Sequence, residues 1–374
     1  FFDSYLYLPC MTVCPSGGVL YYNSANPSIM SDWIAYEEDT FADNYNVNAL
    51  NEAVGEVCDT LDLDDYKAYV YFPIFSTVYG DNGFGDVDGD GVNENFTNIE
   101  DRKKVIKWWI DHLVARYENG EYENLTLNGF YWYHEAIETG DPHEIELLNF
   151  TADYLHSLGL YFIWIPYYCA SGYTDWASFG FDAVNMQPNY MFTESATEKR
   201  VYDNAELTKL LGMGVEIEIE GKAMSTTEYL ERYRSYLRIG VEEGYMNSIK
   251  MYYQDAGPGV FYQAWKSEVA ACRTIYDDTY LYAKRLLTPT ETTLKTDTFN
   301  CESGSSVSIS LEDSNGNELV STVYISCRYG TLKSENDGTI TYNAPEGFTG
   351  TETFIAKGGS TLFTNEYEIT VNVG

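Results

Sequence analysis

Short runs of apolar and aromatic residues recur along the first 287 residues, with amphipathic segments between them. Runs of this length and composition are typical of strands buried on both faces. The pattern therefore predicts seven strands, at residues 3–9, 66–75, 127–136, 159–168, 181–188, 214–220 and 247–255.

Helix signals lie between the predicted strands. Residues 141–144 (Asp-Pro-His-Glu) supply an N-cap, a first-turn proline and a capping-box glutamate, and Gly159 ends that helix. Residues 225–228 (Ser-Thr-Thr-Glu) repeat the capping box before a helix that ends at Gly244. Two more helices are predicted at 46–61 and 98–117.

Strands that alternate with helices indicate a parallel sheet of the α/β class. An eighth strand, at 18–24 or 32–36, would close a (β/α)8 TIM barrel over residues 1–287, which is the predicted fold. An open doubly wound sheet is the alternative. It is disfavoured because no glycine-rich phosphate turn follows any of the strands.

The pattern changes after a threonine-rich linker at 288–297. Residues 298–374 alternate over short strands separated by turn dipeptides such as Asn315-Gly316, which predicts an all-β, immunoglobulin-like sandwich. Residues 337–354 resemble the bacterial immunoglobulin-like and cadherin-like tandem modules of secreted proteins. The resemblance implies a spacer or adhesive unit and a secreted or cell-surface protein. Cys301 and Cys327 both fall in this domain and are a candidate disulfide pair, although the sequence leaves the disulfide pattern open.

The charge composition restricts the classes of molecule that this chain is expected to bind. The chain has 58 acidic and 22 basic residues, for a net charge of −36. Nucleic acids and anionic membranes are poor partners for such a chain, and a neutral carbohydrate is favoured over an acidic one. The sequence contains no run of about 18 apolar residues, so no membrane span is predicted. It begins directly in a strand-like segment, as a trimmed or mature chain does, so the lack of a visible signal peptide says little about export. We expect a monomer without an organic cofactor.

A carboxyl group ends the third predicted strand. Tyr131, Tyr133 and Glu135 alternate onto one face, and aromatic neighbours raise the pKa of a carboxyl group by excluding water. In a parallel barrel the functional residues lie where strands end, so Glu135 is the predicted general acid/base. An ordinary loop acid is the alternative interpretation.

Three glutamates alternate with apolar residues in "GVEIEIEG", so all three share one face of the predicted strand. A soluble protein does not bury three carboxylates without a partner or a purpose. Glu218 is the predicted nucleophile and Glu220 the nearest substitute. Glu216 is expected deeper, in a buried hydrogen-bonded layer. A strand with one solvated acidic face is the alternative.

If one strand before Glu135 went uncounted, Glu135 follows strand four and the triple glutamate lies on strand seven. That arrangement resembles the large superfamily of retaining glycoside hydrolases with (β/α)8 barrels, although His134 stands where that superfamily usually has asparagine. Glycoside cleavage uses one carboxylic acid to protonate the leaving oxygen and one carboxylate to attack or stabilise the anomeric carbon.

Other strand ends carry amide, tyrosine and acidic groups of the kind that bind hydroxyl-rich ligands. Trp132, Trp164 and Trp176 are candidate stacking platforms for sugar rings, although each by itself is better interpreted as a core residue. The predicted substrate-binding residues are Asp3, Tyr133, His134, Tyr167, Tyr168, Asn185, Gln187, Asn189, Tyr190, Tyr253 and Asp255.

"DVDGDGVNEN" begins as a calcium loop does, with oxygen ligands at every second position and a glycine turn. The twelfth position is Thr97 in place of a bidentate glutamate, so the segment is no EF-hand, and Glu94 or Asp81 completes the shell. The sequence predicts a structural Ca²⁺ held by Asp86, Asp88, Asp90, Val92 and Glu94.

The segments "FDSYLYLP", "FYWYHEAI", "WIPYY", "NMQPNYMF" and "GMGVEIEIEG" together resemble a bacterial family of secreted domains of unknown function, over residues 1 to about 287. The resemblance implies a barrel of glycoside-hydrolase type and assigns no residue roles. The predicted function is a secreted, retaining glycoside hydrolase acting on a neutral polysaccharide or glycan. The alternative is a non-catalytic glycan-binding or adhesive surface protein.

Overall fold

A computed structural model describes residues 2–21, 25–77, 83–255, 259–289, 293–316, 318–335, 338–359 and 362–374. The chain divides into two compact units, Phe1–Arg285 and Leu286–Gly374. Each unit has its own hydrophobic core and is described by itself. Within the described ranges, no helix combines the length and the apolar character that crossing a bilayer requires.

The first unit is built on a seven-stranded sheet whose spatial order, β1 to β7, is the order of the strands in the sequence. Every neighbouring pair is parallel. All seven predicted strands are confirmed. They are β1 (Ser4–Leu6), β2 (Ala68–Ile74), β3 (Leu125–Trp132), β4 (Tyr161–Trp164), β5 (Ala183–Met186), β6 (Gly214–Glu218) and β7 (Lys250–Tyr253).

The sheet curls into a half-barrel that brings its two edge strands near each other. The ring of Phe2, just before β1, lies 4.8 Å from the ring of Tyr252 in β7, measured between centroids. In the described part of the chain β7 and β1 are not paired, and no eighth strand closes the sheet. Residues 32–36 belong to helix α1 (Met30–Thr40). Part of the other candidate, residues 22–24, lies outside the described residues.

Alternation along the strands separates two apolar clusters. Phe130 and Trp132 of β3 face outward and join the large core formed with the helices. Tyr131, between them, joins a smaller cluster with Ile163 and Ile165, against which residues of β1, β2 and β7 also pack. Because strands from both edges of the sheet share this second cluster, it fills the concave side.

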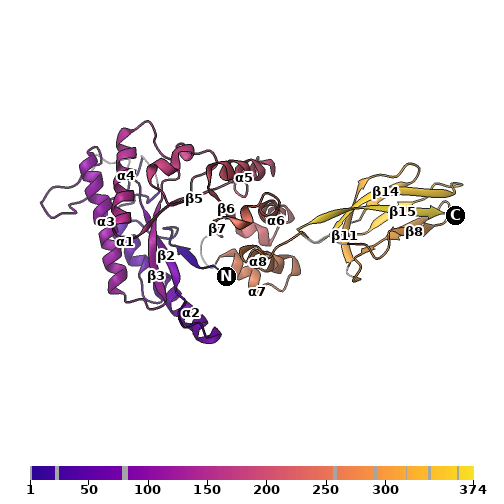
Figure 1. Ribbon diagram of the computed structural model, residues 1–374, viewed down its shortest axis with the longest axis horizontal. Coiled ribbons are helices and arrows are strands. Elements are labelled where there is room, and N and C mark those ends of the chain that lie inside the picture. Colours follow the sequence, from indigo (N-terminus) through magenta and orange to yellow (C-terminus); the bar gives the residue numbers. More distant parts are fainter. Residues whose placement is uncertain are drawn as a thin grey trace. The chain divides into compact units, whose positions relative to one another are not determined.

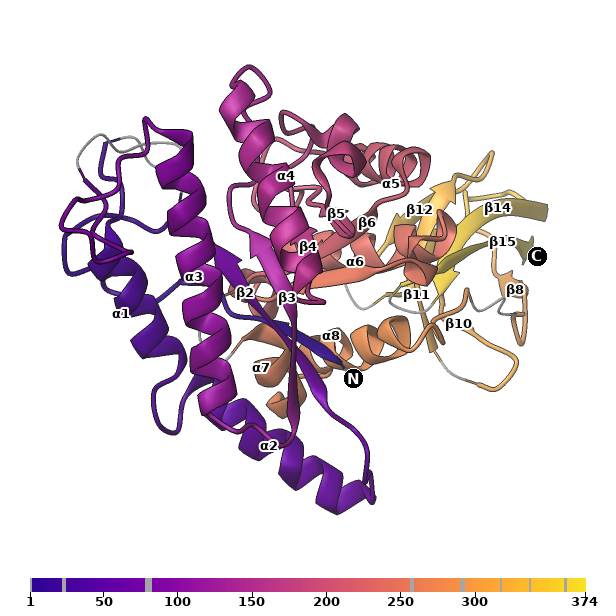
Figure 2. The same cartoon turned by 60° about the vertical axis from the view of Figure 1, so that its left-hand side comes forward.

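Helices cover the outer face of the sheet. Helices α3 and α4 lie side by side beyond β2 and β3 (Figures 1 and 2). The helices after α1 are α2 (Asn46–Leu61), α3 (Ile99–Asn119), α4 (Pro142–Ser157), α5 (Lys199–Leu211), α6 (Thr227–Glu242), α7 (Val260–Lys266) and α8 (Ala270–Ala283), with 3₁₀ turns η1 (Tyr173–Phe179), η2 (Gly221–Met224) and η3 (Tyr245–Asn247).

The predicted helix starts are correct, but the capping boxes are not. The Asp141 side chain accepts a hydrogen bond from the His143 N–H, as an N-cap does. Glu144 instead receives a buried hydrogen bond of 2.6 Å from Arg102. Thr226 makes no side-chain cap, because its hydroxyl donates to the Lys222 carbonyl at 3.1 Å. A tertiary or local partner replaced the expected capping partner in both cases.

The second unit contains β-strands in two sheets, of orders β10-β11-β14-β15-β8 and β12-β13-β9. The pairing of β15 with β8 is parallel and the others are antiparallel. An immunoglobulin-like topology stays a prediction. The strands are β8 (Thr298–Cys301), β9 (Ser306–Ile309), β10 (Leu311–Glu312), β11 (Glu318–Ile325), β12 (Thr331–Ser334), β13 (Ile340–Asn343), β14 (Gly350–Gly359) and β15 (Thr364–Val373).

The candidate disulfide in this unit is wrong. Cys301 and Cys327 are both free. The Cys301 thiol instead lies 3.4 Å from the Ser305 carbonyl, to which it donates. Burial raises the pKa of the Cys327 thiol, and the nearby Glu352 carboxyl adds to the effect.

Candidate active site

The glutamates of β6 are buried, as the alternation predicts. Glu216 is 8% exposed and Glu218 is fully buried. They lie opposite Met251 and Tyr253 of β7. Burial raises the pKa of both carboxyl groups, that of Glu218 to about 7. β6 therefore has no solvated acidic face, and this alternative is wrong.

The carboxyl group of Glu218 is occupied by hydrogen bonds. Its Oε1 atom accepts from the backbone N–H of Asn189 at 3.2 Å. Its Oε2 atom accepts from the hydroxyl of Tyr236 on α6, and that hydroxyl in turn accepts from the N–H groups of Tyr190 and Met191. Glu218 is thereby tied to the loop that follows β5.

Glu135 and Glu216 interact electrostatically across the concave side of the sheet. Burial raises the pKa of Glu135, which is half-buried just beyond β3, and a hydrogen bond with Gln187 opposes the rise. For Glu216, burial has the largest effect, and the negative charges of Glu218 and then Glu135 raise its pKa further.

Two tyrosines lie beside this pair of carboxyl groups. Burial raises the pKa of Tyr131, and the charges of Glu135 and Glu216 add to the rise. The pKa of Tyr253 is raised to about 12, mainly by burial, with added contributions that include both glutamates. Since Tyr131 belongs to β3 and Tyr253 to β7, the two carboxyl groups face a common space between these strands.

Glu220 has different surroundings. It follows β6, its side chain is 17% exposed, and it forms an ion pair of 3.4 Å with Lys222. The backbone N–H of the next residue, Gly221, donates to Asp255 at 3.3 Å. Glu220 thus belongs to the rim beyond the strand end.

Some predicted substrate-binding residues lie with these glutamates. Tyr167 is exposed and forms an isolated bridge with Gln187, whose side chain also donates to the Ile165 carbonyl at 2.9 Å. Tyr133 is half-buried and its ring lies 5.9 Å from that of Tyr131. Asn185 is deeper. It is fully buried and donates to carbonyls of β6 and of the segment before β7.

Other predicted residues are not brought to the site. Asp3 precedes β1 and so lies at the opposite end of the strands. His134 is 7% exposed, and burial lowers its pKa to about 4. Tyr168 packs against the outer core and under Arg200 of α5. Tyr190 lies under the Arg232 guanidinium, 4.7 Å from its ring centroid.

Two of the three candidate tryptophan platforms are core residues, which is the interpretation that the sequence favours for each. Trp132 and Trp164 are buried in the outer core, because outward-facing positions of a sheet covered by helices are closed to ligands. Trp176 is half-buried and donates to the Leu211 carbonyl at 3.0 Å.

The expected strand numbering is not met either. Among the described residues three strands precede Glu135, and the glutamate strand is the sixth. The correspondence with strands four and seven of the retaining glycoside hydrolases therefore does not hold.

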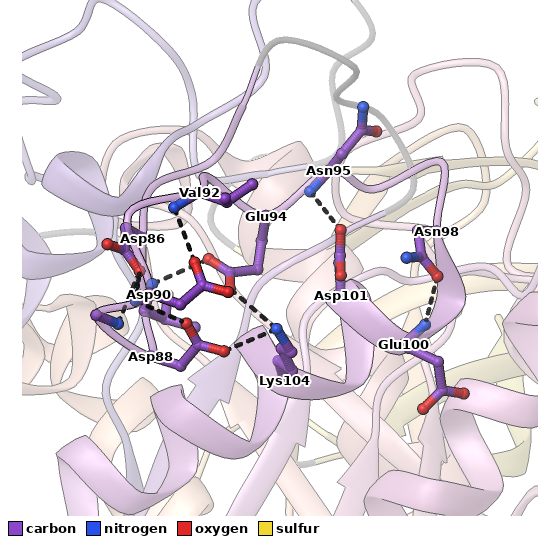
Figure 3. A network of polar contacts seen from close by, with 12 residues as sticks. Asp86, Asp88, Asp90, Val92, Glu94, Asn95, Asn98, Glu100, Asp101 and Lys104 are labelled. Carbon is purple, nitrogen blue, oxygen red and sulfur yellow. Dashed lines mark hydrogen bonds and ion pairs between the residues drawn. The ribbon is translucent and has the colours of Figure 1, made fainter.

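The acidic loop before α3 gathers three carboxyl groups (Figure 3). One oxygen each from Asp86, Asp88 and Glu94 lies within 4.8 Å of the other two. The Lys104 ammonium donates to Asp88 at 2.7 Å and lies 3.7 Å from Glu94. The Asp90 carboxyl instead accepts from the Val92 N–H at 2.8 Å. Asp81 lies outside the described residues.

Three features of the site were not predicted from the sequence. Tyr236 and Arg232 lie on one face of α6, where no local pattern distinguishes them from ordinary helix residues. Phe192, in the loop after β5, is 45% exposed. Its position within "NMQPNYMF" was visible, but its exposure depends on how that loop folds.

Comparisons with known proteins identify the family. The family described as "Domain of unknown function (DUF4855)" matches residues 1–281, and the chain belongs to it. No curated protein matches the chain.

Several solved structures are similar at low identity. The endo-beta-1,4-mannanase from Thermotoga petrophila is 12% identical, over 88% of this chain and 96% of that one, with a TM-score of 0.35. An endo-fucoidan hydrolase of glycoside hydrolase family 107 is 12% identical, over 100% and 62%, with a TM-score of 0.34. The S-layer protein SbsC, domains 4 and 5, is 21% identical with a TM-score of 0.17. Its match covers 23% of this chain and 46% of that structure.

Proposed function

We propose that this member of the DUF4855 family is a glycoside hydrolase that cleaves a neutral polysaccharide or glycan with two carboxyl groups on the concave side of its sheet. The observation that carries the proposal is the placement of Glu135 just after β3 and of Glu216 in β6 opposite Met251, which packs on the concave cluster, with the charges of both glutamates acting on Tyr131 and Tyr253. Two carboxyl groups facing one space are the arrangement that glycoside cleavage requires.

Glu135 suits the general acid/base. A leaving glycosidic oxygen needs a proton, and a raised pKa makes a carboxyl group better able to hold that proton until the leaving oxygen takes it. Burial raises the pKa of Glu135, and Gln187 holds the carboxyl group in place. Glu135 is also only half-buried, so a substrate at the strand ends can reach it.

The second carboxyl group comes from β6, and the geometry favours Glu216. The predicted nucleophile, Glu218, has hydrogen bonds on both oxygens and is fully buried, so an attack on an anomeric carbon would break that network. Glu220 has an ammonium partner on the rim. The charge of Glu135 raises the pKa of Glu216, so Glu216 ionises more readily when Glu135 holds a proton, which is the protonation pattern that glycoside cleavage needs.

The net charge of −36 supports a neutral glycan over a sulfated or uronic one, because an anionic polymer would be repelled. The proposal also places the protein outside the cell, as the resemblance of residues 337–354 to modules of secreted proteins implies. We further propose that Asp86, Asp88 and Glu94 hold a structural Ca²⁺, since carboxylate oxygens this close together suit a hard cation.

Product analysis on a panel of neutral polysaccharides and host glycans tests the activity. The Glu135→Gln variant is expected to lose turnover by on the order of 10³-fold, as removal of a general acid/base does. Glu138→Gln, an exposed acid three residues further along the same loop, is the matched control and is expected to keep full activity.

Full activity in Glu135→Gln would contradict the assignment. Binding of a glycan without any product, in the unmodified chain, would instead support the non-catalytic glycan-binding alternative.

A further inference from the structure

The loop after β5, residues 189–194, is held firmly from its amino-terminal side. Three consecutive N–H groups donate to side chains of other elements: Asn189 to Glu218, and Tyr190 and Met191 to the Tyr236 hydroxyl. Tyr236 is fully buried and Met191 is 1% exposed. The start of the loop is therefore fixed by buried groups of β6 and α6.

Arg232 of α6 holds the same loop by its carbonyl groups. Its guanidinium donates to Tyr190 at 2.5 Å, to Thr193 at 3.1 Å and to Glu194 at 3.0 Å. Arg232 is itself only 7% exposed. A planar guanidinium that satisfies three carbonyls fixes the backbone between them, because its donors point in set directions.

Phe192 lies between these fixed points and its side chain is 45% exposed. The ring contacts that of Tyr253 in a T-shaped arrangement, with centroids 5.7 Å apart at 79°. Tyr253 is the last residue of β7 and interacts with both Glu216 and Glu135. Phe192 thus stands one side chain away from the proposed catalytic pair.

Rigid exposed aromatic rings are well suited to ligands with a flat apolar face. A ring fixed by its backbone loses little conformational entropy when a ligand covers it, and the buried apolar area favours association. Pyranose rings present such a face, because their axial C–H groups lie together while the hydroxyls point outward. The polar groups near Tyr253, among them Asp255, suit the hydroxyls.

We infer that Phe192 and Tyr253 form an aromatic subsite that stacks on the C–H face of a neutral pyranose ring next to Glu135 and Glu216. Tyr236 and Arg232 are positioning residues for this subsite, since they contact the loop and not the sugar. The inference rests on the proposed function and specifies where the substrate is held.

Affinity of the chain for neutral hexasaccharides of glucose, mannose and N-acetylglucosamine tests the subsite. Titration calorimetry in the Glu135→Gln background measures binding without turnover, and KM and kcat are measured in the otherwise unmodified chain. Phe192→Ala is expected to weaken binding and raise KM on the order of tenfold, with kcat nearly unchanged, as loss of one aromatic contact does. Phe192→Tyr is expected to restore binding.

Tyr161→Ala is the matched control. Tyr161 is an aromatic of similar exposure, 51%, but it begins β4 at the opposite end of the strands, so its removal should leave binding unchanged. Equal affinity of Phe192→Ala and the parent would overturn the subsite and leave the proposed function intact. If neither the hexasaccharides nor the wider glycan panel is bound or cleaved by the unmodified chain, the proposed function fails and the subsite with it.

Discussion

Two segments of the first unit place acidic residues at every second position, yet their surroundings give them opposite properties. In residues 86–94 the carboxyl of Asp88 is 39% exposed, and its hydrogen bond with the Lys104 ammonium lowers its pKa. In β6 Glu218 is fully buried, and burial raises its pKa to about 7. The same spacing therefore yields stable anions in one place and proton-binding groups in the other.

The difference lies in burial and in the nearest charged partner. Asp88 lies at the surface beside the Lys104 ammonium, which favours the charged form. Glu218 also accepts hydrogen bonds, from the Asn189 N–H and the Tyr236 hydroxyl, but burial outweighs them and raises its pKa. An acid in the first environment is suited to bind a cation, and an acid in the second is suited to transfer a proton.

The largest expected effect is on turnover, and it distinguishes Glu216 within β6 from Glu220 just beyond it. Glu216→Gln is expected to reduce turnover by on the order of 10³-fold, because it removes a carboxyl group that faces Glu135. Glu220→Gln is the matched control on the rim and is expected to reduce turnover by less than about tenfold, since its carboxyl group pairs with Lys222. Steady-state kinetics on the cleaved glycan measures both.

If Glu220→Gln lowers turnover more than Glu216→Gln does, the second catalytic carboxyl group is that of Glu220 on the rim. The proposed difference in role between the buried and the exposed acids is then wrong. If Glu218→Gln alone stops turnover, at unchanged stability, then Glu218 is the partner of Glu135, as the sequence predicts.

The next effect is a dependence of stability on pH. The folded chain holds a proton on Glu218 up to about pH 7, whereas the unfolded chain releases it near pH 4.5. Between these values the folded state binds more protons, so this contribution to the free energy of unfolding is present at low pH and is lost as the pH rises. At about 1.4 kcal/mol per pKa unit, the loss is about 3 kcal/mol.

Urea unfolding of the unmodified chain and of Glu218→Gln at pH 5 and pH 8 checks this. The variant is expected to gain stability relative to the parent as the pH rises. His134, whose pKa is lowered to about 4, has the opposite dependence, but it is common to both chains and cancels. A difference between the chains that does not change with pH would show that Glu218 is ionised in the folded state throughout.

Much of the sheet could be predicted because buried strands have a local signature. Continuous apolar and aromatic runs marked all seven strands. The segment at 32–36 failed because Trp33 and Tyr36 are three residues apart, so that both lie on the buried face of α1. Three residues is a helical spacing, and a short apolar run does not distinguish the two structures by itself.

The candidate site could be predicted only where it depends on residues that are close together in the sequence. The alternation of Glu216 and Glu218 revealed a buried acidic face. Which of the two is occupied by hydrogen bonds depends on Tyr236, 18 residues beyond Glu218 on a helix. The capping box at residues 141–144 failed for the same reason, because Glu144 is hydrogen-bonded to Arg102, 42 residues away in the sequence. Contacts between distant elements leave no local pattern.

The smallest expected effect is that Ca²⁺ binding to the acidic loop, residues 86–94, stabilises the folded chain. Such an effect would confirm that the acids of this loop bind a cation, whereas those of β6 bind protons. At a free Ca²⁺ concentration of ten times Kd, binding to the folded chain alone adds about 1.4 kcal/mol to the free energy of unfolding. Asp86→Asn is expected to abolish this gain, because Asp86 belongs to the cluster of three carboxyl groups. Asp90→Asn is the matched control and is expected to reduce it less, since the Asp90 carboxyl is engaged by the Val92 N–H.

A substitution of Lys104 adds a second test of Ca²⁺ binding by this loop. Its ammonium lies against Asp88 and Glu94, where it competes electrostatically with a bound cation, so Lys104→Met is expected to lower the Kd for Ca²⁺. Thermal unfolding with Ca²⁺ and with a chelator measures all three variants. If Ca²⁺ leaves the unfolding temperature of the unmodified chain unchanged, the loop binds no Ca²⁺. The negative charges of its carboxyl groups are then compensated by the ion pairs with Lys104 and not by a metal.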